Sequence, residues 1–423
     1  MLIDFTVENY RSIKGPVTLS AVAQGRKAGT ALKGKGRARI KPDHEIAPGY
    51  PVEGWGFELL PVLAIFGANA SGKSNVVRAL DDFLTFVALG DIRLTDIRDS
   101  TNFDKFVPFK LDPESSIAPT RFEVRVFLWG DIYTYTLSLN RTRILSERLE
   151  YAKSNSKRNR RLFHRDWSED TRKFEWKNGE DFKGPHTQLE ASLGEREPFL
   201  SILGRVKPEW DVSWLRNRFR GVVSVDYATP AAIYLSSEIF EEERKNVIET
   251  VQQFDTGIDD ISLEKNEDRW HMYAYHNIEK EKIRWPFEEE SMGTQRLFDL
   301  AFRIHIGLSF GTLTIIDELG SNIHPNITRA IVKMFQNPKT NPRRTQLIFT
   351  SHDNTLQRGN LLRRDQIWFT QKRDDRSTEL YALSDFKVRN DLAIDKAYLA
   401  GSFGAIPFLP SDEEFIYAAE EVK

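Results

Sequence analysis

The chain has 423 residues, of which 40% are hydrophobic and 29% are charged, and its formal net charge is −2. This composition is typical of a soluble globular protein and argues against an evenly basic surface for nucleic acid. The sequence has no cysteine, which excludes disulfides, thiolate zinc sites and a cysteine nucleophile. The first residues lack the pattern of a signal peptide, and no later stretch approaches the ~18 apolar residues of a membrane span. We therefore expect a cytoplasmic protein that does not enter a membrane.

A phosphate-binding loop is predicted at residues 67–74. The letters GANASGKS fit the pattern G-x-x-x-x-G-K-[ST], after an apolar run at 61–66 that suits a buried strand and before a helical stretch at 75–80. In this arrangement backbone N–H groups and the positive helix end surround a phosphate. Lys73 would contact the β- and γ-phosphates, and the Ser74 hydroxyl would hold Mg²⁺. The residues expected to bind the nucleotide are Gly67, Asn69, Ala70, Ser71, Gly72, Lys73, Ser74 and Asn75.

The loop alone leaves open which class of nucleotide enzyme this is, because kinases, GTPases and many motor proteins share it.

Strand patterns dominate the region after this loop. Residues 120–139 alternate apolar and polar side chains around Gly130-Asp131, which predicts a hairpin with a two-residue turn there. Further strands are expected between 141 and 183, with a turn at Asn178-Gly179, and at 269–277. A charged helix at 236–254 lacks the three or four heptads of a coiled coil. We expect an N-terminal lobe at 1–150, a variable insertion at 151–235 and a C-terminal lobe at 236–423.

Two basic stretches, 24–41 and 153–165, are candidates for binding the phosphates of nucleic acid. A solvated, charged loop explains them equally well, and the first stretch has no aromatic residues for base stacking. Nucleic acid therefore stays open as a partner.

A capped amphipathic helix is predicted within residues 288–308. Ser291 suits its N-cap, and the apolar residues recur at i, i+3 and i+4. An ordinary capped helix explains Ser291 but not Gly293, since glycine in a first turn costs stability relative to alanine. A glycine is useful there if a phosphate must approach the backbone closely.

Two further apolar strands end in polar residues. The strand at 313–316 is followed by Asp317 and Glu318, and the strand at 347–350 is followed closely by His352. At the carboxyl edge of a parallel sheet, Asp317 can join the Mg²⁺ shell, Glu318 can orient or deprotonate the attacking water, and His352 can sense the γ-phosphate. Because an acidic pair after a strand is common, the roles predicted for Asp317 and Glu318 depend on the presence of the other motifs.

The order of these motifs resembles the ABC-type ATPase heads of the SMC, RecF and OLD proteins. It is most similar to one branch, the RloA-like ATP-binding proteins of prokaryotic defence loci. The resemblance covers most of the chain and matches least at 20–60 and 150–235. It is carried by IDFTVENYRSIKGPVTLS, FGANASGKSN, FVPFKLDPES, EEESMGTQRLFDLA, TIIDEL, FTSHD, LRRDQIWFT and KAYLAGSFGAIPF.

This resemblance implies an α/β fold: an ABC-type P-loop ATPase head with a mixed sheet, a β-rich N-terminal lobe, an inserted middle region and no long coiled coil. It also implies a homodimer or higher homo-oligomer in which each ATP lies between the phosphate loop of one chain and the signature helix of the other. Ser291 and Gly293 would then act in trans. The sequence departs from the family pattern in two places. Relatives more often carry an acidic residue and a second serine where this chain has Gly320-Ser321-Asn322, and the glutamine that usually senses Mg²⁺ in such heads is not identified in this sequence.

The defence branch implies an ATPase that uses ATP and Mg²⁺ to control a separate effector, a toxin or nuclease, in immunity against phage. We expect no nuclease domain in this chain, because only about 70 residues follow His352. The alternative is a RecF-like DNA-binding ATPase clamp in DNA repair or maintenance. A small-molecule phosphotransferase is disfavoured, since it has no use for Ser291 and Gly293.

Overall fold

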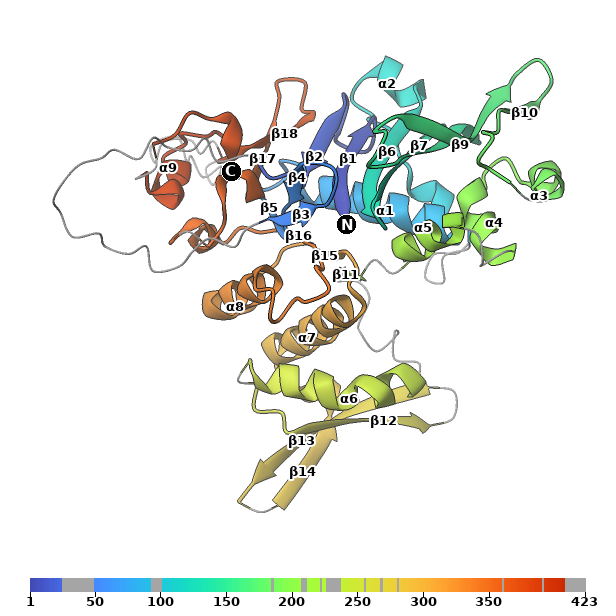
Figure 1. Ribbon diagram of the computed structural model, residues 1–423. Helices are drawn as coiled ribbons and strands as arrows, with labels where there is room; N and C mark the ends of the chain where they lie inside the picture. The colour runs from blue at the N-terminus through green and yellow to red at the C-terminus, as the bar shows by residue number, and fades with distance from the viewer. Residues whose placement is uncertain are drawn as a thin grey trace, which may run out of the picture.

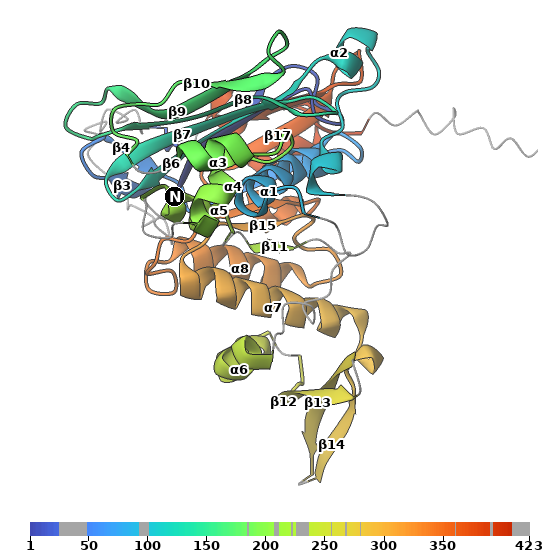
Figure 2. The ribbon, with the colours of Figure 1, turned by 90° about the vertical axis from the view of Figure 1, so that its right-hand side faces the viewer.

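The computed structural model describes residues 1–24, 49–92, 101–183, 186–206, 211–220, 223–225, 237–254, 256–266, 269–279, 281–359, 361–389 and 392–407. These residues form two large sheets with helices between and below them, and a small helix-and-sheet unit at one end (Figures 1 and 2).

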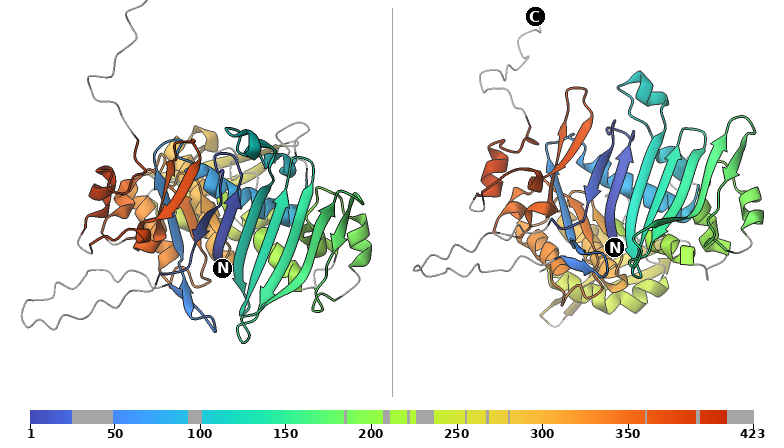
Figure 3. Two further views of the ribbon diagram at one scale, coloured as in Figure 1. Left: turned by 90° about the horizontal axis from the view of Figure 1, so that it is seen from above. Right: turned by 45° about the horizontal axis from the view of Figure 1, so that its top comes forward.

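An antiparallel sheet of seven strands forms one outer layer of the molecule (Figure 3). Its strands alternate buried and exposed side chains, as expected for a sheet with one solvated face. In spatial order the strands are β10 (Lys173–Trp176), β9 (Asn159–Ser168), β8 (Ile144–Ala152), β7 (Asp131–Leu139), β6 (Thr120–Leu128), β1 (Leu2–Glu8) and β2 (Val17–Ser20).

Two turns predicted from the sequence are wrong in position. Leu128 pairs with Asp131, so the turn of the β6–β7 hairpin is Trp129-Gly130, and both residues have the positive φ of a type I′ turn (52° and 90°). The turn expected at Asn178-Gly179 lies two residues later, at Glu180-Asp181, where the Phe182 N–H donates to the carbonyl of Gly179 at 3.1 Å. The Gly179 N–H instead donates to the carbonyl of Leu162, which keeps this segment alongside β9.

The second large sheet is mixed and carries the phosphate loop. Every neighbouring pair is parallel except the last, where β18 runs antiparallel to β17. Strand β5 is apolar throughout because both its faces are covered. The spatial order is β11 (Val223–Val225), β15 (Thr314–Ile316), β16 (Leu347–Thr350), β5 (Val62–Gly67), β17 (Ile367–Lys372) and β18 (Thr378–Ala382).

Helices pack against both faces of this mixed sheet (Figure 2). Side chains such as Leu63 and Ile65 pack with α1 in the core between the two sheets, whereas Val62, Ala64 and Phe66 pack in the core that α7 and α8 complete. The helices between the sheets are α1 (Lys73–Leu89), α4 (Phe199–Val206) and α5 (Asp211–Arg220); those below are α7 (Met292–Phe310) and α8 (Pro325–Gln336). The described residues between 151 and 220 thus extend the seven-stranded sheet and the helix layer, and the domain limits chosen from sequence stay a prediction.

The small unit at the end of the molecule precedes α7 in the chain and lies against it (Figure 1). It consists of α6 (Ser237–Gln252) and an antiparallel sheet of β12 (Asp260–Asn266), β13 (Arg269–Ile278) and β14 (Glu281–Pro286). The longest helix in the described part of the chain is α7, with 19 residues. The predicted α/β architecture, with a β-rich N-terminal lobe, a mixed sheet and no long coiled coil, is confirmed for these residues.

The other strands and α-helices of the described chain are short: β3 (Tyr50–Val52), β4 (Phe57–Leu59), α2 (Pro113–Ile117), α3 (Thr187–Ser192) and α9 (Ile394–Leu399). Single 3-10 turns lie at Asn102–Lys105, Phe287–Glu289, Asn354–Gln357, Arg364–Gln366 and Leu383–Asp385. Of the helices so described, none has the length and apolar character needed to cross a bilayer.

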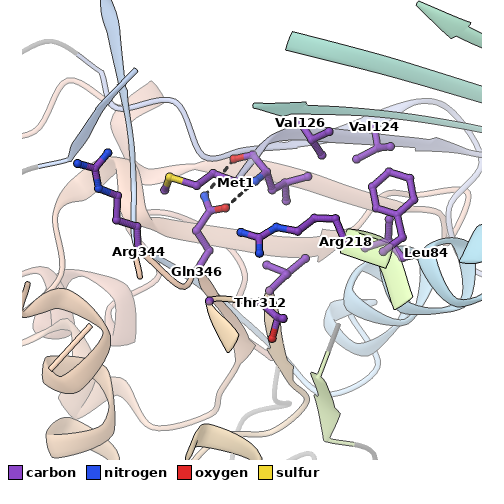
Figure 4. Close-up of a pocket in the computed structure, with 12 residues that line it drawn as sticks. Met1, Leu84, Val124, Val126, Arg218, Thr312, Arg344 and Gln346 are labelled. Atoms are coloured by element: carbon purple, nitrogen blue, oxygen red, sulfur yellow. Dashed lines mark hydrogen bonds between the residues drawn. The ribbon is translucent and has the colours of Figure 1, made fainter. Parts of the chain in front are cut away.

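One glutamine side chain fastens the two large sheets together (Figure 4). The Gln346 carbonyl accepts from the N–H of Leu2 at 2.6 Å, and its amide donates to the carbonyls of Leu2 and Leu60 at 3.0 and 3.1 Å. A pocket beside it is lined partly by Met1 and Arg218. Because Gln346 precedes β16, this pocket lies at the opposite ends of the parallel strands from the phosphate loop.

Candidate functional site

The phosphate loop needs its glycines because two neighbouring strands press against it. Gly72, the N-cap of α1, has a φ of +107°, and a Cβ there would lie 2.0 Å from the hydroxyl oxygen of Thr378. A Cβ on Gly67 would lie 2.5 Å from the carbonyl oxygen of Thr370. Ala70 also has a positive φ, of 60°. The loop therefore has a conformation that few sequences can adopt, and β17 and β18 hold it there.

Lys73 lies inside this loop. Its Nζ donates to the carbonyls of Gly67 at 2.8 Å and Ala68 at 3.0 Å, and the residue is only 5% exposed. Burial lowers the pKa of Lys73 to about 8, against the opposing influence of Asp317 and Glu318. The site thus contains a desolvated ammonium group whose hydrogen bonds go to carbonyl oxygens.

Two side chains of the predicted nucleotide set are already bonded within the chain. The Ser71 hydroxyl lies 2.6 Å from that of Thr370, and the Asn75 amide donates to the Ser12 hydroxyl at 2.7 Å. The side chains of these residues thus brace the loop from within the chain. The sequence analysis did not assign a role to Ser12 and Thr370, because they are distant in the chain from the loop that they contact.

The two halves of the site meet at Asp317. This residue follows β15, and its Oδ1 accepts from the Ser74 hydroxyl at 3.1 Å, a contact between residues 243 positions apart. The same oxygen accepts from the Thr350 hydroxyl at 2.6 Å. The structure therefore places Ser74 and Asp317, both expected to bind Mg²⁺, next to each other, and Thr350 is an additional residue that the sequence analysis did not single out.

Glu318 has a left-handed backbone conformation, with a φ of +54°. Its N–H donates to the Thr350 hydroxyl at 2.7 Å, and its carboxylate accepts from the Ser321 hydroxyl at 3.2 Å. A non-glycine residue in this conformation costs free energy, and such residues cluster at functional sites.

His352 lies close enough to Lys73, Asp317 and Glu318 for their charges to change its pKa. Burial and the positive charge of Lys73 lower the pKa of His352, while Glu318 and Asp317 oppose the shift. His352 is therefore a neutral imidazole at pH 7, able to donate one hydrogen bond and accept another. The structure thus brings together Lys73, Ser74, Asp317, Glu318 and His352.

Ser291 and Gly293 lie at the exposed start of α7. The Ser291 hydroxyl accepts from the N–H of Thr294 at 3.1 Å, so the predicted N-cap is confirmed. A Cβ on Gly293 would lie 3.4 Å from the carbonyl oxygen of Asn322, which is ordinary contact. Among the described residues, these two are beside the segment that follows Glu318 rather than against the phosphate loop of their own chain.

The oxygen atoms of Ser74 and Asp317 fit Mg²⁺, which prefers hard oxygen ligands and keeps several waters. Within the described ranges, no group of three or more His, Asp or Glu side chains could hold a metal by itself. A Mg²⁺ ion at Ser74 and Asp317 would therefore take its other ligands from phosphate oxygens and water.

The mixed sheet, the phosphate loop and the acidic pair define a P-loop ATPase, an enzyme that hydrolyses ATP. Residues 62–357 match the family described as "AAA domain, putative AbiEii toxin, Type IV TA system". The match spans more than half of the chain, and the chain belongs to this family.

A search of proteins with curated functions found no match. Among solved structures, the SMC head domain from Thermotoga maritima is 12% identical with a TM-score of 0.40, covering 90% of this chain and 98% of that one. An SmcHead bound to the C-winged helix domain of ScpA is 14% identical with a TM-score of 0.40, covering 90% and 97%. An Smc head from Pyrococcus furiosus, bound to the C-terminal domain of ScpA, is 12% identical with a TM-score of 0.35, covering 95% and 98%.

Proposed function

We propose that this ATPase is a switch that completes its active sites only when two copies meet, and that its ATP cycle controls a separate effector protein in defence against phage. In each site Lys73 and the N–H groups of the loop bind the phosphates, and Ser74 and Asp317 hold Mg²⁺. Magnesium supplies positive charge for the phosphate oxygens. Glu318 accepts a proton from the attacking water, and the neutral imidazole of His352 donates a hydrogen bond to the γ-phosphate.

The observation that best supports a shared site is that neither the backbone conformation nor the packing of this chain requires a glycine at position 293. Its φ is outside the left-handed region, and a Cβ there would make only ordinary contacts with Asn322 and Ser291. The neighbouring Met292 is 75% exposed, so this end of α7 is accessible. A first-turn glycine that its own chain does not require is explained if the phosphates of a second chain's ATP approach the backbone there.

The defence role is supported by the family description, which names a toxin and a toxin–antitoxin system, and by the resemblance to the RloA-like branch. The effector is proposed as a separate protein because the described residues are accounted for by the ATPase fold and the small unit on α7.

Mixing two inactive variants tests the shared site. Lys73→Ala removes the ammonium group that binds phosphate, and Ser291→Arg blocks the exposed helix end. In a mixed dimer, the loop of the Ser291→Arg chain faces the intact helix end of the Lys73→Ala chain. If chains exchange freely, an equal mixture should recover about a quarter of the wild-type ATPase rate, because half of the dimers have one complete site. No recovery, with mixed dimers confirmed by two affinity tags, would refute the shared site.

Glu318→Gln tests the assignment of the base. This variant should bind ATP, hydrolyse it very slowly and accumulate as a nucleotide-bound dimer on size-exclusion chromatography with light scattering. Hydrolysis at the wild-type rate would show that Glu318 is not the base. The controlled effector should co-purify with this trapped dimer and be encoded beside it.

The alternative, a DNA-binding clamp, has one structural observation in its favour. Three exposed cations of the second basic stretch, Lys157, Arg158 and Arg161, have no carboxylate partner within the described part of the chain. Trp129 and Trp214 are 60% and 53% exposed and touch each other at the same end of the sheet. By contrast, Arg165 of this stretch is buried against a carboxylate, and residues 25–41 of the first stretch lie outside the described residues.

The clamp therefore predicts that DNA stimulates the ATPase in a salt-dependent way, and that replacing the three cations with glutamine removes the stimulation. The switch predicts that DNA leaves the rate unchanged and that the effector changes it.

A further inference from the structure

We propose that Thr350 is a positioning residue for this ATPase, and that its single hydroxyl group sets the orientation of both the metal-binding acid and the base. The proposal rests on the roles proposed above for Asp317 and Glu318. It adds a residue that belongs to neither the phosphate loop nor the acidic pair.

Thr350 is the last residue of β16, the strand between β15 and β5, and it is fully buried. A threonine hydroxyl has one hydrogen to donate and two lone pairs. It donates to Asp317 Oδ1 at 2.6 Å and accepts from the N–H of Glu318 at 2.7 Å. The hydroxyl is thus bonded to both members of the acidic pair, and a buried hydroxyl that is bonded in this way cannot turn freely.

The contact with Asp317 determines which carboxylate oxygen faces the metal site. Oδ1 receives hydrogens from both Thr350 and Ser74. Hydrogen bonds to an ionised carboxylate are stronger than those between neutral groups, so the two donors hold one rotamer of the aspartate. Within the described residues Oδ2 has no such donor, so this oxygen would be available to a bound Mg²⁺ ion.

The contact with Glu318 supports a backbone conformation that is otherwise unfavourable. The left-handed φ of +54° places the Glu318 side chain, and the N–H bond to Thr350 compensates part of its cost. The end of β16 also holds the next residue, since Leu319 N–H donates to the Thr350 carbonyl at 2.8 Å. Loss of the hydroxyl should therefore change the metal site and the base together while the strand stays paired.

Substitution of Thr350 by valine tests this inference, because valine has the same shape and suits a buried strand. Removing a hydrogen bond to a charged group is expected to raise the Mg²⁺ concentration for half-maximal ATPase activity roughly tenfold and to lower kcat by tenfold or more. ATP binding measured without Mg²⁺ should be unchanged, since Lys73 is not involved. Thr350→Ser retains the hydroxyl and should restore both parameters to within about threefold of the wild type.

Thr345→Val is a matched control at the opposite end of β16. Thr345 is also buried, immediately before β16, and its hydroxyl donates to the carbonyl of Gly307 at 3.0 Å, far from the acidic pair. It should lower stability without changing the Mg²⁺ dependence. If Thr350→Val is poorly folded, Thr350→Ala removes the same hydroxyl without placing a methyl group against the carboxylate, and the same shift is expected.

A wild-type Mg²⁺ dependence in a folded variant that lacks the Thr350 hydroxyl would overturn the proposal, as would an equal shift in Thr345→Val. Asp317→Asn separates this failure from that of the proposed site. If Asp317→Asn does not weaken Mg²⁺ dependence, the metal role of Asp317 is wrong; if it does and Thr350→Val does not, only the role of Thr350 is wrong.

Discussion

The buried ammonium group of Lys73 predicts that ATP binding weakens as the pH rises above 8. Burial lowers the pKa of Lys73 to about 8 in the nucleotide-free protein, whereas the phosphates of bound ATP favour the charged ammonium and raise it. Below pH 8 the group is already protonated, so binding takes up no proton. Above pH 8 binding must take up one proton, and the affinity falls with increasing pH.

The size of the effect follows from the pKa. If the ordinary lysine value is restored in the complex, the affinity at pH 9 should be about tenfold weaker than at pH 7, because each pH unit above the free pKa costs a factor of ten. In the protein without nucleotide, the lowered pKa of His352 keeps this side chain neutral over the same range. A terminal phosphate, with a second pKa of about 6, is largely ionised above pH 7.5.

Isothermal titration calorimetry with ATP in EDTA, between pH 7.5 and 9.5, measures this directly. Two buffers with different ionisation enthalpies should reveal uptake of one proton at pH 9 and of much less than one at pH 7.5. Lys73→Arg is the control, because arginine stays protonated and its affinity should not depend on pH. A constant affinity for the wild type across this range would refute the assignment of Lys73 as the titrating phosphate ligand.

Three further predictions concern the residues that hold the site and the fold. Gly72→Ala should abolish ATP binding, measured by calorimetry, because the added Cβ collides with Thr378 and the φ is unfavourable for alanine. Glu147→Gln should lower the free energy of unfolding, measured with urea, by roughly 3–5 kcal/mol, because it leaves the fully buried Arg165 without its carboxylate. Breaking an exposed ion pair such as that of Arg121 with Glu8 should lower it by under about 1 kcal/mol. Gln346→Leu should cost roughly 1–3 kcal/mol in the same assay by leaving main-chain groups of Leu2 and Leu60 unpaired, and no change would show that the sheets are held together without it.

Local patterns were enough to predict the catalytic strands and the helix at 292–310. The strand at 347–350 and the N-cap at Ser291 were predicted correctly, because alternation, apolar runs and capping depend on residues close in the chain. The hairpin at 120–139 was predicted, but its turn was placed one residue late. Trp129 is an uncommon residue for a type I′ turn, so the glycine drew the prediction toward Asp131.

The sequence by itself determined the class of chemistry, since the phosphate loop, the acidic pair and the histidine are local motifs whose residue types state what each can bind. Only the tertiary structure decided how these motifs are held. The order of strands places β16 between β15 and β5, and this is why Thr350 touches both acidic residues, a contact that its place before His352 in the sequence does not reveal. The same packing of β17 and β18 against the loop makes Gly67 and Gly72 necessary. Contacts between strands distant in the chain depend on topology, and no local pattern of residues records them.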